Sequence, residues 1–186
     1  MSDDAALVRR YLGGEEIAAR ELVERFQALV FALCFRMLGQ REDAEDVAQD
    51  VFLRTFRSLK GWDSTRPLKP WILAIAANCC RTVLKQRPRN SFGGSFHLDQ
   101  AVAAGSGNSR DLADELEAAI RELRDDYRLC FILFYQEDLS CAEVASVMSC
   151  PEGTIKTWLH RARRELAERL RRRGVVPHAE YQLYRV

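Results

Sequence analysis

Residues 140–170 read SCAEVASVMSCPEGTIKTWLHRARRELAERL, and this stretch predicts two helices joined by a tight turn. Ser140 and Glu143 have the spacing of a capping box, in which the two side chains satisfy backbone amides at the start of a helix. The Pro-Glu-Gly sequence at residues 151–153 ends that short helix and begins the next one, with an acidic residue near the new N-terminus. The pattern is that of a helix-turn-helix unit.

The second predicted helix has one apolar face and one basic face. Its apolar residues recur at steps of three and four, which indicates a buried stripe: Ile155, Leu159, Ala162, Leu166 and Leu170. From Lys156 to Arg173 there are eight basic and two acidic residues, a local charge of +6, whereas the whole chain carries +1. A basic helix can also be a solvated face, but the preceding helix and turn favour docking in the major groove of DNA. The candidate contacts are Lys156, Thr157, His160, Arg161 and Arg164.

The composition is typical of a globular protein, with 186 residues, 47% hydrophobic and 30% charged. This length fits one large or two small domains. No window approaches 18 uninterrupted apolar residues, and the N-terminus lacks the apolar run of a signal peptide. We expect a cytosolic, cytoplasmic protein without a membrane span.

The cysteines do not form a metal-binding pattern. There are six cysteines and three histidines, the histidines are scattered, and no C-x-x-C pair occurs. Most of the cysteines fall in predicted helix interiors, where a reduced thiol acts as a small hydrophobic group. We therefore predict no metal and no cofactor, and no disulfide between the adjacent Cys79 and Cys80, which point to different helix faces.

The chain as a whole predicts an all-α protein with two small helical domains joined by a flexible linker. We expect helices at residues 7–12, 15–38, 42–60, 70–86, 111–124 and 126–136, followed by the helix-turn-helix pair. The helix over 15–38 should bury Ile17, Leu22, Phe26, Val30, Leu33 and Met37. The domain boundaries that we predict are 1–88, a linker over 89–110, 111–174, and a C-terminal tail over 175–186. The linker is rich in Gly and Ser, so the separation of the two domains should vary.

Acidic residues recur along the predicted helix over 42–60. Asp43, Asp46 and Asp50 are three and four residues apart, which places them on one ridge. The helix dipole favours acids in the first turn, but Asp50 lies two turns further on. The ridge is either a solvated face or a docking surface for a basic partner.

The predicted helix over 70–86 has the opposite charge. Asn78, Arg81 and Lys85 share one side of it, and residues 78–90 contain four basic residues and no acid. Arginine and lysine neutralise phosphates, and asparagine can contact a base edge. Trp62, in the preceding loop, could stack on an unpaired base beside this helix.

Three segments together resemble bacterial RNA polymerase sigma factors of the small extracytoplasmic-function (ECF) subfamily of the sigma-70 family, which retains regions two and four. The matching segments are DAEDVAQDVFLRTFRSL at 43–59, PWILAIAANCCRTVLKQRPR at 70–89 and LSCAEVASVMSCPEGTIKTWLHRARREL at 139–166. They occur in the family's order and belong to a resemblance over most of residues 5–88 and 114–172.

The resemblance implies a non-catalytic protein that binds core RNA polymerase, through the β′ clamp helices and the β flap, and promoter DNA. Asp43, Asp46, Gln49 and Asp50 resemble the surface that docks on the clamp helices. The minus-ten element would be read by Trp62, Asn78, Arg81 and Lys85. The minus-thirty-five element would be read by Lys156, Thr157, His160, Arg161 and Arg164. The family also implies an anti-sigma factor. The LKPW sequence at 68–71 departs from the family pattern, so the minus-ten preference could differ.

Two other classes stay open from the residues alone. One is a dimeric helix-turn-helix regulator with an N-terminal sensor domain, although a sensor needs neither the acidic ridge nor the second basic face. The other is a thiol or metal sensor that uses Cys141 and Cys150. An enzyme is disfavoured, because no clustered acid, base or nucleophile is evident.

Overall fold

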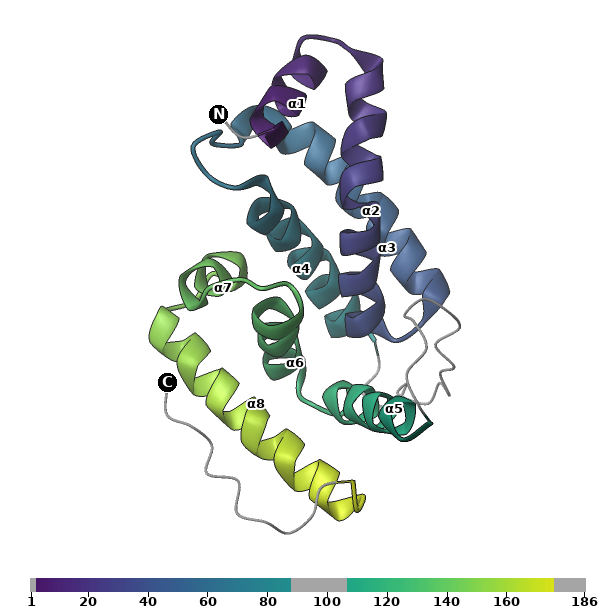
Figure 1. Ribbon diagram of the computed structural model, residues 1–186. Coiled ribbons are helices and arrows are strands. Elements are labelled where there is room, and N and C mark those ends of the chain that lie inside the picture. Colours follow the sequence, from purple (N-terminus) through teal and green to yellow (C-terminus); the bar gives the residue numbers. More distant parts are fainter. Residues whose placement is uncertain (1–2, 88–106, 176–186) are drawn as a thin grey trace.

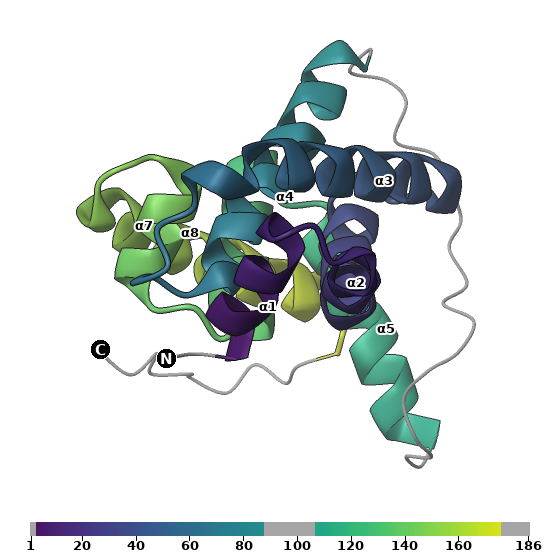
Figure 2. The ribbon, with the colours of Figure 1, turned by 90° about the horizontal axis from the view of Figure 1, so that it is seen from above.

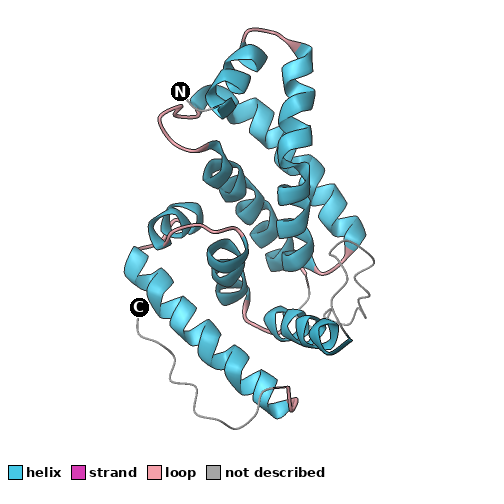
Figure 3. Cartoon of the chain, viewed as in Figure 1, coloured by secondary structure: helices cyan, strands magenta, loops and turns pink. Residues whose placement is uncertain are grey.

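The computed structural model describes residues 3–87 and 107–175. These residues form helices and no β-strand, as predicted (Figure 3). The first group of helices comprises α1 (Asp3–Leu12), α2 (Glu16–Leu38), α3 (Arg41–Ser58) and α4 (Leu68–Gln86). The second group comprises α5 (Gly107–Arg121), α6 (Asp125–Phe131), α7 (Cys141–Met148) and α8 (Glu152–Arg172). Two short turns, a 3-10 turn at Leu59–Gly61 and a π-helical turn at Ile132–Gln136, extend α3 and α6.

The N-terminal module, residues 3–87, is a bundle in which α2, α3 and α4 pack on one another (Figure 1). Helix α2 buries the predicted residues from Leu22 onward, but Ile17 is 64% exposed and that prediction is wrong. The residue of the first turn that continues the buried stripe is Ala18, four positions before Leu22, and it is fully buried. Ile17 is one position out of phase with that stripe. Gly39 ends α2 in the left-handed conformation, and its N–H donates to the Phe35 carbonyl.

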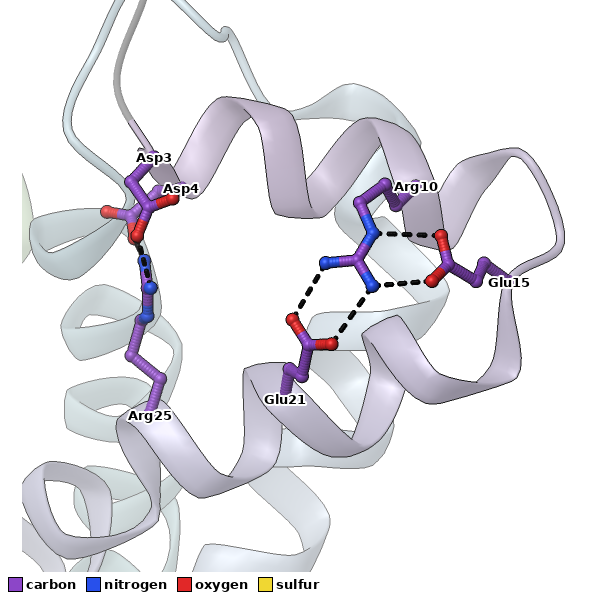
Figure 4. A network of polar contacts seen from close by, with 6 residues as sticks. All are labelled: Asp3, Asp4, Arg10, Glu15, Glu21 and Arg25. Carbon is purple, nitrogen blue, oxygen red and sulfur yellow. Dashed lines mark hydrogen bonds and ion pairs between the residues drawn. The ribbon is translucent and has the colours of Figure 1, made fainter.

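Ion pairs fix α1 across the first turns of α2 (Figure 4). The residues of this network are Asp3, Asp4, Arg10, Glu15, Glu21 and Arg25. The Arg10 guanidinium lies between two carboxylates, with its Nε 2.8 Å from Glu15 Oε2 and its Nη1 2.8 Å from Glu21 Oε2. These hydrogen bonds raise the pKa of Arg10 and lower the pKa of Glu15 and of Glu21. The network is exposed, so it orients α1 more than it stabilises the fold.

The C-terminal module, residues 107–175, contains the predicted helix-turn-helix. Ser140 forms the predicted capping box: its Oγ accepts from the Glu143 N–H at 3.3 Å, and its own N–H donates to Glu143 Oε2 at 2.9 Å. Helix α7 ends at Ser149, which has a φ of 53°. The predicted apolar stripe of α8 is confirmed for Ile155, Leu159, Ala162 and Leu166, which are buried, and its last member, Leu170, is half-buried.

Several predicted helix boundaries differ from the structure, and the largest shifts are at the starts of α1 and α5. Helix α1 begins at Asp3, four residues before its predicted start. Helix α5 begins at Gly107, so the last four residues of the predicted linker are helical. Residues 88–106, the rest of that linker, lie outside the described part of the chain. The predicted helix over 126–136 begins at Asp125 and finishes as the π-helical turn.

The two modules are in contact, which the sequence did not lead us to expect. Helix α4 packs against α7 in both views (Figures 1 and 2). One buried apolar cluster contains Leu68 and Ile72 of α4 together with Val144 and Met148 of α7. We expected the linker to leave the separation of the modules variable, but apolar burial joins them here. Within the described ranges, no helix combines the length and apolar character that a membrane span requires.

Candidate nucleic-acid interface

The first turns of α8 present an open polar face. All five predicted contact residues are exposed: Lys156, Thr157, His160, Arg161 and Arg164. Lys156 Nζ lies 2.8 Å from Glu152 Oε1, and Arg161 Nη1 donates to the Tyr127 hydroxyl at 3.2 Å. The first contact lies within one helical turn and the second joins α8 to α6, and both leave the face accessible. The structure therefore brings together the residues that sequence predicted for this helix.

The C-terminal end of α8 is less basic than its sequence suggests. Arg173 Nη1 lies 2.7 Å from Glu115 Oε2, and Arg169 Nη1 lies 2.6 Å from Glu122 Oε2. Glu115 belongs to α5 and Glu122 to the turn that follows it, about fifty residues earlier in the chain. Part of the local charge of +6 is therefore neutralised within the module, while Arg171 and Arg172 at this end remain exposed.

Helix α4 does not present its three predicted contacts on one open face. Asn78 and Lys85 are exposed. Arg81 is turned toward the C-terminal module, where its Nη1 donates to the Met148 carbonyl at 3.4 Å and its Nη2 lies 3.6 Å from Asp126 Oδ1. The side chain of Arg81 is 23% exposed.

Trp62 is also covered in this structure. Its exposed fraction is 8%, and it belongs to the buried apolar cluster. Its backbone N–H donates to the Leu59 carbonyl at the end of the 3-10 turn. Trp62 therefore cannot stack on a base in this conformation.

The four docking candidates on α3, Asp43, Asp46, Gln49 and Asp50, differ in their surroundings. Asp43 pairs with Arg87 at the end of α4, and Asp50 Oδ2 lies 2.8 Å from Arg54 Nε. Asp46 and Gln49 are exposed. Gln49 lines a groove of about 470 Å³ between α2 and α3. Asp43 and Asp50, at the two ends of the predicted ridge, both contact α4 or its C-cap residue, because Asp50 Oδ2 also accepts from Cys79 Sγ at 3.8 Å. Gln49, which was not part of that ridge, lies beside the groove.

The groove itself was missed by the sequence reasoning. Its walls are mainly apolar, with one acidic residue: Val23, Gln27, Ala28, Phe31, Glu45, Ala48, Gln49 and Phe52. Phe52, on the groove side of α3, is only half-buried. The spacing of Glu45, Gln49 and Phe52 by four and three residues was a usable signal.

Comparison with known proteins identifies the family. The Sigma-70 region 2 model matches residues 22–90, and the Sigma-70 region 4 model matches residues 113–166. The ECF RNA polymerase sigma factor SigW of Bacillus subtilis is 28% identical, in a match that covers 88% of this chain and 95% of that protein. The RNA polymerase sigma-H factor of Pseudomonas aeruginosa is 30% identical, with 90% of this chain and 93% of that protein covered. This chain is an ECF sigma factor of the sigma-70 family.

Solved structures agree with this assignment. The sigma factor RpoE of Bartonella quintana, in complex with the anti-sigma factor NepR, matches with a TM-score of 0.66 and 25% identity. That match covers 82% of this chain and 96% of that one. CnrH in complex with the cytosolic domain of CnrY matches with a TM-score of 0.69 at 22% identity, which shows a common fold. Sigma factors bind core RNA polymerase and promoter DNA and direct the initiation of transcription.

The cysteines of the sigma factor lie mostly in its interior. Cys34, Cys79, Cys80 and Cys130 are buried. Burial raises the pKa of Cys79 to about 11 and that of Cys130 to about 12, so both are neutral thiols at physiological pH. Within residues 3–87 and 107–175, no cluster of His, Cys, Asp or Glu has a geometry that could hold a metal ion.

Proposed function

We propose that the two modules of this sigma factor read two separate promoter elements, with the C-terminal module on the minus-thirty-five element. The observation that carries this assignment is the open face at the start of α8, which bears Lys156, Thr157, His160 and Arg161. A capped helix and a tight turn precede that face, as in helix-turn-helix units that dock a recognition helix in the major groove. Lys156 and Arg161 can contact a phosphate or a guanine edge, and the Thr157 hydroxyl can contact a phosphate or a base edge.

The N-terminal module would bind core polymerase and the minus-ten element. In this proposal, Asp43, Asp46, Gln49 and Asp50 face the basic surface of the polymerase, including the β′ clamp helices. Charge complementarity of this kind orients docking and raises the association rate. Minus-ten reading falls to α4, with Asn78, Arg81 and Lys85 as candidate contacts.

Trp62 is a minus-ten contact only if the loop before α4 rearranges, because its ring is covered here. Opening promoter DNA exposes unstacked bases, and an aromatic ring beside a basic helix can stack on one of them. We assign residues 1–88 to sigma region 2, 89–110 to the linker, 111–174 to sigma region 4 and 175–186 to a C-terminal tail.

The sigma factor would act without chemistry of its own, by recruiting and positioning the polymerase in the bacterial cytoplasm. We include an anti-sigma factor among its proposed partners, because a relative of the same fold is bound to one. The β flap is a further proposed polymerase contact, for the C-terminal module. The alternative of a dimeric regulator with a sensor module is not favoured, because the relatives that match about nine tenths of the chain are sigma factors.

Run-off transcription tests the proposal. Purified core polymerase with this sigma factor would be incubated with a library of random promoter sequences, and the transcribed templates would be sequenced. We expect enrichment of two spaced elements. Absence of any sigma-dependent transcript would contradict the proposal, and enrichment of one palindromic site would favour the dimeric regulator.

A further inference from the structure

A buried carboxylate joins the two modules at the start of α4. Glu137, which follows the π-helical turn of the C-terminal module, is 5% exposed. Lys69 of the N-terminal module donates from Nζ to the Glu137 carbonyl at 2.7 Å and lies 3.4 Å from its Oε2. Arg36 Nη1, at the end of α2, lies 3.4 Å from Glu137 Oε1. Two cations from one module therefore hold one acid of the other.

A second contact joins the modules further along α4. The Arg81 guanidinium reaches the carbonyl of Met148, the last residue of α7, and lies 3.6 Å from Asp126 of α6. A helix C-terminus carries partial negative charge, so it attracts a cation. The side chain on α4 that is proposed to contact the minus-ten element is thus occupied by the C-terminal module.

The interface between the modules combines apolar contacts with charged ones, and the desolvation cost of the charges offsets part of the stability that apolar burial provides. The cluster shared by α4 and α7 favours contact through burial of apolar area. Arg128 of α6 is fully buried and donates to the Arg121 carbonyl at 2.9 Å. Burial lowers the pKa of Arg128 and raises that of Glu137, so both charges incur a desolvation cost while the modules are closed. Contacts of this kind specify one arrangement without making it strongly stable.

We propose that Lys69, Arg36 and Glu137, with Arg81 bound at the end of α7, form a latch that holds the unbound sigma factor closed and covers Arg81 on its minus-ten surface. The masking role of the latch rests on the proposed function of Arg81; the closed arrangement itself does not. Polymerase or promoter contacts that separate the modules release Arg81. This is a population shift between a closed and an open state.

Charge reversal at Lys69 tests the latch in the full-length chain. Lys69 is 38% exposed at its side chain, so Lys69→Glu leaves the core intact while it places a carboxylate opposite Glu137. The matched control is Lys60→Glu, which makes the same charge change at an exposed position of the N-terminal module. Small-angle X-ray scattering would measure the radius of gyration of each variant without DNA or polymerase, and circular dichroism would verify its helical content.

We expect the radius of gyration to increase in Lys69→Glu and to stay unchanged in Lys60→Glu. The double variant Lys69→Glu/Glu137→Lys restores an attractive pair, so its radius should return toward that of the wild type. If Lys69→Glu is as compact as the wild type, the latch is wrong. If Lys60→Glu expands equally, a general charge effect explains the result and the latch is also wrong.

Binding of a forked minus-ten oligonucleotide tests the masking role. By fluorescence anisotropy without polymerase, Lys69→Glu should bind about fivefold or more tightly than Lys60→Glu, because the apparent affinity scales with the open fraction. Equal affinities together with an expanded Lys69→Glu would refute masking of Arg81. If the scattering results support the latch but the wild-type sigma factor directs no run-off transcription, the proposed function is contradicted and the closed arrangement is not.

Discussion

The two candidate DNA-contacting helices differ in what covers them. The start of α8 is open: Lys156 pairs with Glu152 of the same helix, Arg161 donates to Tyr127 of α6, and Lys156 and Arg161 both remain exposed. The corresponding side of α4 is partly closed, because Arg81 is held by the other module. The difference teaches that exposure of a basic helix face depends on tertiary partners as much as on its own sequence.

The largest effect that we expect comes from reversing a charge on the acidic surface of α3. Asp50→Lys should weaken binding to core polymerase by about 100-fold, because facing like charges costs several kcal/mol. Titration of labelled core polymerase measures this affinity. Glu24→Lys, at an exposed position of α2, is the matched control. The ion pair between Asp50 and Arg54 is exposed and contributes little to folding, so the variant should unfold at nearly the same temperature. Normal assembly of Asp50→Lys with core would remove Asp50 from the docking surface.

A smaller effect should separate the open helix from the covered one. Arg161→Ala should weaken the binding of minus-thirty-five duplex by about 1–3 kcal/mol if the side chain contacts a base edge. Without polymerase, Arg81→Ala should leave that affinity unchanged, whereas in the holoenzyme it should reduce transcription. Gel-shift titration and run-off assays measure the two quantities, with Arg171→Ala at the far end of α8 as control. Equal losses for Arg81→Ala and Arg161→Ala in the unbound protein would contradict the comparison.

The helix that supports the open face should depend on its cap. Ser140→Ala removes the acceptor for the Glu143 N–H and should lower the free energy of unfolding by about 1 kcal/mol. Ser146→Ala, inside the same helix, is the control and should be neutral or slightly stabilising. Thermal unfolding monitored by circular dichroism measures both. A Ser140→Ala variant as stable as Ser146→Ala would mean that the capping box contributes nothing.

The smallest effect that we expect is a pH dependence of the stability that the capping box contributes. Hydrogen bonds from Ser140 lower the pKa of Glu143. The carboxylate therefore stabilises the folded state above the ordinary Glu pKa of about 4.3, and this contribution is lost as the pH falls through the lowered folded value. The stability difference between wild type and Ser140→Ala should be larger near neutral pH than in acid. Urea unfolding at both conditions measures it, and a difference that grows in acid would contradict this account.

Local patterns in the sequence predicted the helices and the cap of the C-terminal module correctly. The α8 stripe and the Ser140 capping box depend on residues a few positions apart, so their spacing was sufficient. The phase error at Ile17 arose where α2 begins, because a single turn has too few residues to fix the buried stripe. The family assignment followed from three ordered segments and is confirmed by the comparisons.

The contacts that the sequence could not provide are long-range. Arg81 and Met148 are 67 residues apart, Arg87 and Asp43 are 44 apart, and Arg173 and Glu115 are 58 apart. Side chains that look unpaired along a helix find partners only when the helices pack. This is why the α4 face, the acidic ridge and the end of α8 carried less open charge than their sequences suggested.

The pairing of α5 with the end of α8 has a mechanical consequence. The chain enters the C-terminal module through α5, and Arg169 and Arg173 tie that helix to the last turns of α8. A pull on the chain before α5 therefore acts on α8 at the end opposite Lys156 and Arg161. The attachment of the incoming chain and the proposed DNA contacts are therefore at opposite ends of α8.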